Sequence, residues 1–167
     1  TMSKPFEADV IDNFSPALRL LNDRVKKIAG QIKVGVKNDQ HANSKLTVAQ
    51  IGQIHESGAP KRNIPARPFL SPAVRNNATK YIRFIGTQIA PMLLGRTNSG
   101  EIMDDIGAMA VQDVQQYIEN GNFAPLKPAT IKRKGHSKPL IDTGQLKRSI
   151  VANREGGRDD ALSWRGM

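Results

Sequence analysis

The sequence contains no cysteine among its 167 residues. This absence excludes a disulfide framework, thiolate zinc sites, CxxC redox chemistry and a cysteine nucleophile. Aromatic residues make up only 5% of the chain, so aliphatic side chains must fill most of any core. The composition favours a protein that is assembled inside a cell.

Long apolar runs are also missing. No stretch approaches the roughly 20 apolar residues that a membrane-spanning helix needs. The first residues, TMSKPFEADV, lack the continuous apolar stretch of a secretory signal. We therefore expect a soluble chain with no membrane partner. Its length predicts a single domain over residues 1–154, followed by a flexible C-terminal tail at 155–167.

Acidic residues are outnumbered, with 15 Asp and Glu against 25 Lys and Arg, which gives a formal net charge of +10. Residues 61–83 hold six bases and no acid, residues 101–119 hold five acids and no base, and residues 125–154 hold eight bases against Asp142. Such blocks predict complementary faces that join neighbouring copies of the chain, or else a solvated face with local pairing. Nucleic acid is the other partner that this charge favours.

Hydrophobic periodicity predicts an α+β fold, in which several helices, two of them long, pack on a small antiparallel sheet. Alternating residues predict strands at about 32–37 and 150–153. Helical spacing predicts helices over 16–29, 48–56, 72–90, 100–120 and 143–148. Ser71-Pro72 is typical of a helix start, and Gly121 is the expected C-cap of the helix at 100–120. The apolar face of the helix at 72–90 is expected to comprise Tyr81, Ile82, Ile85 and Ile89, with Pro91 kinking or ending it.

Prolines shape the segment between the second and third of these helices. Pro65 and Pro68 each remove a backbone donor and bias the preceding residue toward extended geometry. We expect an extended arm at 57–71 with Phe69 and Leu70 as apolar anchors. The arm is preset either for docking on a partner or for packing on the protein's own core.

Three short motifs invite a catalytic or ligand-binding interpretation. Asp142-Thr143-Gly144 is the tripeptide of aspartic proteases, which leaves a protease-like dimer as one alternative, although an N-cap at Asp142 or Thr143 explains it more simply. The segment from Gly95 to Glu101 has the glycine spacing of a phosphate loop but carries glutamate where lysine is needed, so a turn with a helix cap is expected. The histidines lack metal-ligand spacing. We expect no enzyme activity, no metal and no cofactor.

A basic segment near the C-terminus could contact phosphate oxygens of a DNA backbone. It lacks the interleaved aromatic residues that stack on bases, so sequence-specific binding is not expected. The candidate DNA-facing residues are Lys127, Lys132, Arg133, Lys134 and Lys138. A non-specific DNA-binding protein is therefore the main alternative function.

Two segments taken together resemble a known family. QIHESGAPKRNIPARPFLSPAV at 53–74 and FAPLKPATIKRKGHSKPLIDTGQLKRSI at 123–150 are similar to signature segments of tailed-bacteriophage virion morphogenesis proteins, the Mu protein G group and related tail-completion or neck proteins. Their order along the chain is reversed relative to the Mu-type pattern. The match covers about fifty of the 167 residues.

This resemblance implies a non-enzymatic structural protein of the virion neck or tail, acting in tail completion or head–tail joining. It implies a homo-oligomeric ring, a hexamer or dodecamer, that contacts proteins such as the connector, tail terminator or tail tube and is assembled in the cytoplasm of a bacterial host. The candidate interface residues lie in the arm and in the LIDTG segment: Ile64, Pro65, Arg67, Pro68, Phe69, Leu70, Asp142, Thr143, Gly144 and Leu146.

Overall fold

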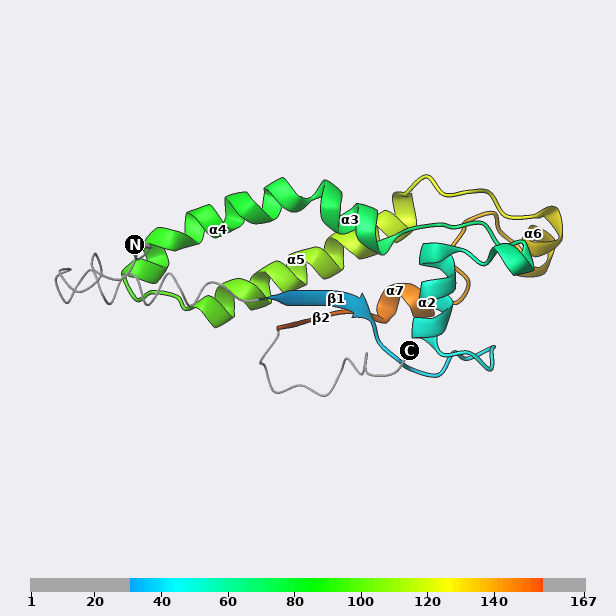
Figure 1. The fold of residues 1–167 in the computed structure, drawn as a ribbon, viewed down its shortest axis with the longest axis horizontal. Helices are drawn as coiled ribbons and strands as arrows, with labels where there is room; N and C mark the ends of the chain where they lie inside the picture. Colours follow the sequence, from blue (N-terminus) through cyan, green and yellow to red (C-terminus); the bar gives the residue numbers. More distant parts are fainter. Residues whose placement is uncertain (1–30, 155–167) are drawn as a thin grey trace, which may run out of the picture.

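The computed structural model describes residues 31–154 (Figure 1). The elements in chain order are β1 (Ile32–Val36), α2 (Val48–Ser57), the 3₁₀ turn η1 (Pro60–Arg62), α3 (Leu70–Asn76), α4 (Ala78–Leu93), α5 (Ser99–Asn120), α6 (Pro128–Lys134), α7 (Gln145–Arg148) and β2 (Ile150–Arg154). The predicted helix at 16–29 and the predicted tail at 155–167 lie outside the described residues. The predicted α+β class is confirmed.

Helix α5 is the central element of the fold. It begins with a capping box, in which the Asn98 side chain accepts from the backbone N–H of Glu101 and the Glu101 side chain accepts from that of Asn98. The predicted C-cap, Gly121, donates its N–H to the carbonyl of Tyr117 at 2.8 Å. The interpretation of residues 95–101 as a turn with a helix cap is thus confirmed. Helix α4 lies on one side of α5 and the two strands lie on the other (Figure 1).

The sheet of the described residues has two antiparallel strands, with Ile32 opposite Arg154 and Val36 opposite Ile150. A close approach to α5 fixes its position, because a Cβ placed on Gly107 would lie 3.1 Å from the Cβ of Ala152. A larger side chain at position 107 would push the sheet away from the helix. The sheet therefore depends on this glycine for its packing distance.

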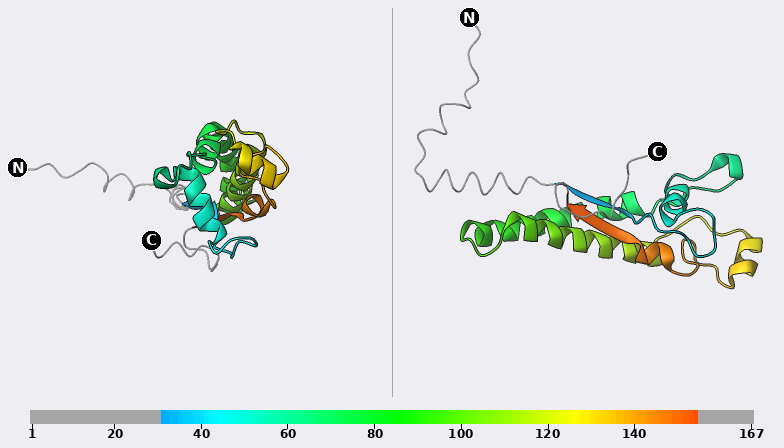
Figure 2. Two further views of the ribbon diagram at one scale, coloured as in Figure 1. Left: turned by 90° about the vertical axis from the view of Figure 1, so that its right-hand side faces the viewer. Right: turned by 90° about the horizontal axis from the view of Figure 1, so that it is seen from below.

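Two apolar clusters lie along α5. The first joins β1, α2 and α7 to the second half of α5 and comprises Val36, Val48, Phe69, Ala73, Val114, Ile118, Leu140, Leu146 and Ile150. The second fills the space between α4 and the first half of α5 and comprises Tyr81, Met92, Ile102, Met103, Ile106 and Ala110. Seen from below, the described part of the chain is elongated along α4 and α5, and the end-on view shows its compact cross-section (Figure 2).

The single helix that the sequence predicts after Ser71 is wrong in two respects. The helical segment is divided at Asn77 into α3 and α4, and the Asn77 side chain donates to the carbonyl of Ala73 at 2.9 Å, a local bond that competes with helix continuation. The helix also begins at Leu70, and Ser71 does not cap it. Pro91 does not end α4, which continues to Leu93.

The predicted apolar face of α4 is only partly correct. Tyr81 is buried and Ile85 packs against the second cluster, but Ile82 is 68% exposed and Ile89 is 42% exposed. At about 100° per helical residue, the two exposed isoleucines lie to one side of the face that Tyr81, Ile85 and Met92 turn toward α5.

Helix α6 was not among the predicted elements. It starts with Pro128 at its first position and ends at Gly135, whose φ of 77° is left-handed. This arrangement of proline at the start and glycine at the end is a common helix signature. Hydrophobic periodicity does not predict α6, because Ala129 and Ile131 are the only apolar side chains between Pro128 and its basic end.

Candidate functional site

The two segments that carry the family resemblance meet at one end of the molecule. Arg67 in the arm is only 5% exposed, and its guanidinium Nε donates to the carbonyl of Ala124 at 2.7 Å and its Nη2 to that of Pro125 at 2.8 Å. The Arg67 backbone N–H also donates to the carbonyl of His55 at 2.7 Å. A buried charge is tolerated when hydrogen bonds satisfy it, as they do here. Arg67 therefore joins the arm to the segment that follows α5.

Glu56 performs the capping role that the sequence assigned to Ser71. One carboxylate oxygen accepts from the backbone N–H groups of Phe69 and Leu70 at 2.8 and 2.9 Å. The other accepts from the N–H and the hydroxyl of Ser71 at 2.9 and 2.7 Å. The first N–H groups of a helix have no partner within the helix, so this carboxylate supplies one from α2.

These hydrogen bonds change the acidity of Glu56. Burial by itself raises the pKa of the carboxyl group, but the hydrogen bonds from Leu70, Ser71 and Phe69 outweigh it and lower the pKa below its ordinary value of 4.5. The Glu56 side chain is therefore ionised near neutral pH, in the form that caps α3.

Three candidate interface residues are buried in the protein's own structure. Phe69 and Leu146 belong to the first apolar cluster, and Arg67 is enclosed as described above. The alternative that the arm anchors pack on the core thus holds for Phe69. Leu70 and Ile64 are half-buried. The candidates exposed to solvent are Pro65, Pro68, Asp142 and Thr143.

The Asp142-Thr143-Gly144 tripeptide forms a surface loop that leads into α7. The predicted side-chain N-cap is wrong: the residue at the cap is Gly144, with a left-handed φ of 74°, and no side chain caps the helix. The Thr143 hydroxyl instead accepts from the backbone N–H of Gln145 at 3.3 Å. Glycine is needed here because a side chain is strained at such a φ. The tripeptide thus has a structural explanation in its turn, and the predicted interface role of Asp142, Thr143 and Gly144 stays a prediction.

A cavity of about 210 Å³ lies between α2, α6 and the LIDTG loop. Its apolar lining includes Ile51, Leu126 and Leu140, and its polar lining includes His55 and Lys134. Burial, and to a smaller extent the positive charges of Arg67 and Lys134, together lower the pKa of His55 from 6.5 to about 4. His55 is therefore neutral at physiological pH.

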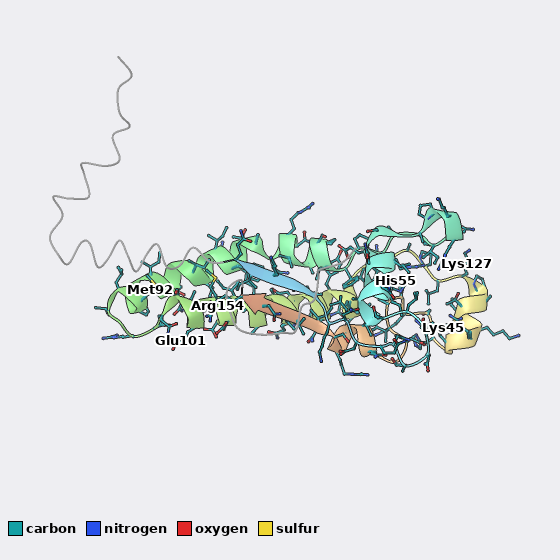
Figure 3. The ribbon with its side chains drawn as sticks, turned by 60° about the horizontal axis from the view of Figure 1, so that its bottom comes forward. Lys45, His55, Met92, Glu101, Lys127 and Arg154 are labelled. Atoms are coloured by element: carbon teal, nitrogen blue, oxygen red, sulfur yellow. The ribbon has the colours of Figure 1, made fainter. Side chains whose placement is uncertain are left out.

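Most of the candidate DNA-facing residues are solvent-exposed at this same end. Lys127, Lys132, Arg133 and Lys138 are exposed on and around α6. Lys134 is half-buried, donates to the carbonyl of Lys138 at 3.1 Å, and has its pKa lowered chiefly by burial. Figure 3 shows Lys127 at one end of the molecule and Glu101 near the other.

The acids of α5 are largely paired within the chain. Asp113 binds Lys80 at 2.6 Å, Glu119 binds Lys147, and Asp104 lies 3.7 Å from Arg154. These partners come from both basic blocks that flank the acidic helix in the sequence. The local pairing considered for the charge blocks is therefore present. No ion pair is found for the four exposed cations of the α6 end among the described residues.

Comparison with protein families, with curated proteins and with solved structures finds no match for this chain. Within residues 31–154, no cluster of three or more His, Asp or Glu side chains is arranged to hold a metal ion. No helix in that range is both long enough and apolar enough to cross a bilayer. The function must therefore be inferred from the chain itself.

Proposed function

We propose that this protein is a structural subunit of a phage neck or tail, which forms a ring during tail completion or head–tail joining. The observation that supports this most directly is the meeting of the two family-like segments through Arg67 and the first apolar cluster. Segments far apart in the sequence thus form one structural unit. A shared structural unit explains why both would be present together in a protein of this family.

The surface chemistry supports an assembly role. Helix α4 exposes Ile82 and Ile89, and an exposed apolar face of this kind is typical of a protein interface. The Asp-Thr-Gly tripeptide, the one motif with a catalytic precedent, is accounted for by its turn into α7. We accordingly propose that the protein is not an enzyme and that its site of action is the virion, with a connector, tail terminator or tail tube as neighbour.

Particle composition tests this proposal. Quantitative peptide mass spectrometry of purified virions is expected to detect six or twelve copies of the chain per particle, as one hexameric or dodecameric ring requires. Native mass spectrometry and negative-stain imaging of the purified protein, or of neck complexes isolated from particles, are expected to show a closed ring. Absence from purified virions would overturn the proposal.

Contact with DNA is a second function that a specific observation favours. The exposed cations Lys127, Lys132, Arg133 and Lys138 project from one end, whereas Asp113 and Glu119, the acids in the half of α5 nearer that end, are already paired. An anionic partner from outside the chain, such as the DNA backbone, fits this end better than a second copy does. We propose that the α6 end faces the DNA passage of the ring.

Salt dependence tests the DNA contact. Binding of random-sequence duplex DNA is expected to weaken steeply between 50 and 200 mM salt, and each phosphate contact removed lowers the salt slope by about 0.9. Replacing Lys127 and Lys132 by glutamine is expected to flatten that slope without sequence preference. Replacing Lys33 in β1 and Arg96 after α4, both exposed and outside the α6 end, by glutamine is a matched control. Binding that is insensitive to salt, or no binding at all, would remove this function and leave the ring proposal in place.

A further inference from the structure

One flank of α4, beside the face that packs on α5, is an unpartnered apolar face in the described part of the chain. Ile82 and Ile89 lie seven residues apart, two helical turns, and so project on the same side. They are 68% and 42% exposed, and Leu94 just beyond the helix is 65% exposed. Of the two charged residues of this helix, Lys80 is paired with Asp113 of α5, which leaves the exposed Arg83, next to Ile82, as the positive charge beside this face.

Helices α4 and α5 form a helical hairpin. A groove of about 430 Å³ lies on a different side of this hairpin, along α5 beside strand β2. Its apolar lining includes Met103, Ala108, Val111 and Ala152. Gly107 also lines the groove, at the place where α5 and the sheet approach most closely. The groove therefore offers a concave apolar surface where α4 offers a convex one.

The charges at the groove complement those of α4. The first half of α5 carries Glu101, Asp104 and Asp105, all exposed, and Asp104 lines the groove together with Arg154, so the acids outnumber the one base there. Asp104 remains 69% exposed despite its contact with Arg154. Opposite charges across an interface favour one docking orientation and speed association.

We propose that the Ile82–Ile89 face of α4 docks into the α5–β2 groove of a second copy of this chain. This inference rests on the proposed ring and names its contact surfaces. The two surfaces lie on opposite sides of α5, since α4 covers one side and β2 the other (Figure 1). One copy therefore uses its α4 against one neighbour and its groove against the next. Such a head-to-tail contact generates a ring when the rotation between copies closes.

Charge insertion on α4 gives the first test. The full-length double variant Ile82→Glu, Ile89→Glu is expected to convert the assembly into single chains of 18.3 kDa, as measured by native mass spectrometry. Both positions are exposed, so circular dichroism and thermal unfolding should match those of the parent protein. The matched control is Thr79→Glu, Thr87→Glu, which adds the same charge at exposed polar positions of the same helix. Assembly that survives the isoleucine variant, or is lost equally in the control, would overturn the proposal.

Cysteine cross-linking gives the second test, since the sequence has no cysteine that could interfere. A mixture of Ile89→Cys chains and Gln112→Cys chains is expected to form a disulfide-linked pair on mild oxidation, because position 112 lines the groove. Each variant alone is expected to stay unlinked, since a head-to-tail contact never brings a residue to its own copy. Arg62→Cys mixed with Ile89→Cys is the control, and it should stay unlinked.

The results separate this inference from the proposed function. Self-linking of Ile89→Cys would mean that α4 pairs with α4 across a two-fold axis, and a ring without any Ile89–Gln112 link would mean that another surface is used. Either result overturns the inference and leaves the ring in place. A parent protein that is a single chain at every concentration and is absent from virions overturns both.

Discussion

The two ends of this molecule are held together by different kinds of contact. At the end that contains α2 and α6, polar groups join segments far apart in the sequence, as Arg67 and Glu56 do. At the end formed by α4 and α5, apolar packing dominates, and Ile82 and Ile89 remain outside it. The first end uses long-range hydrogen bonds for Arg67 and Glu56, although the buried Nδ1 atoms of His55 and His136 have no partner there among the described residues. The second leaves apolar surface uncovered, which is why we assign contact between copies to the hairpin.

The sharpest test of this comparison replaces the same residue type in both helices of the hairpin. Ile102→Ala in α5 is expected to lower the free energy of unfolding by about 2–5 kcal/mol, because the side chain is fully packed in the second cluster. Ile82→Ala in α4 is expected to change it by less than about 0.5 kcal/mol. Urea unfolding of the dissociated chain measures both. Equal losses of unfolding free energy in the two variants would mean that the Ile82–Ile89 face of α4 is covered within the chain.

Removing the buried guanidinium tests the other end. Arg67→Met keeps the aliphatic stem but leaves the carbonyls of Ala124 and Pro125 without their donors, and we expect a loss of about 3 kcal/mol. Arg62→Met, at an exposed position of η1, should cost less than about 0.5 kcal/mol. Thermal unfolding checks both variants. A small effect at position 67 would show that the Glu56 cap and the apolar residues hold the arm without the guanidinium.

One buried carboxylate lies in the otherwise apolar contact between α4 and α5 and links the two helices. Asp113 accepts from the Lys80 ammonium at 2.6 Å and from the Tyr81 hydroxyl at 2.8 Å. Burial and this carboxylate together raise the pKa of Tyr81 above its ordinary range. Asp113→Asn is expected to cost about 2 kcal/mol.

Asp105→Asn provides the control for that variant, because Asp105 is an exposed acid of the same helix. Chemical denaturation should place the control within about 0.5 kcal/mol of the parent. A cost at Asp113 no larger than that at Asp105 would contradict a structural role for the buried carboxylate.

The smallest expected effect is the loss of the Glu56 cap. Glu56→Gln should cost about 1 kcal/mol at pH 7, as typical caps do. The pKa of Glu56 is lowered in the folded state, so its contribution is complete above the unfolded value of 4.5 and is lost as pH falls through the folded pKa. The parent and variant should therefore converge in stability at low pH, in unfolding curves recorded from pH 7 down to pH 2.5.

His55 affects the same curves but in a different interval. Its folded pKa of about 4 lies below 6.5, so protonation of the unfolded chain removes stability as pH falls from 6.5 toward 4. This loss is shared by parent and variant. A stability difference between them that stays constant down to pH 2.5 would contradict the capping role of Glu56.

The sequence predicted the elements whose signals are local. Asn98 and Glu101 form a capping box readable at a spacing of three residues, and the alternation from Ile32 to Val36 predicts β1 without reference to anything else. The orientation of α4 was not predictable in this way. Its isoleucines fit a helical stripe, but which part of that stripe faces α5 depends on tertiary packing.

The candidate site was predicted less well than the fold for the same reason. Arginine is usually exposed, so the sequence gives no sign that Arg67 is buried. Its burial depends on two carbonyl groups after α5, which lie 57 and 58 residues further along the chain. The Glu56 cap is likewise invisible to rules that search next to a helix start. The exposed lysines around α6 agree with expectation, because lysine is seldom fully buried.

The first part of the arm, residues 58–66, forms a short excursion that is closed at its own base. Ala59 and Ile64 form an isolated bridge, with backbone bonds of 2.9 and 3.1 Å, and Gly58 lies so close to Ala66 that a Cβ would be 2.8 Å from its nitrogen. Behind this base, Glu56 and Arg67 hold the flanking segments. Residues 60–63 are thus the place where the chain can be lengthened or can carry an epitope tag, because added residues at a closed, exposed tip need not disturb the contacts that anchor it.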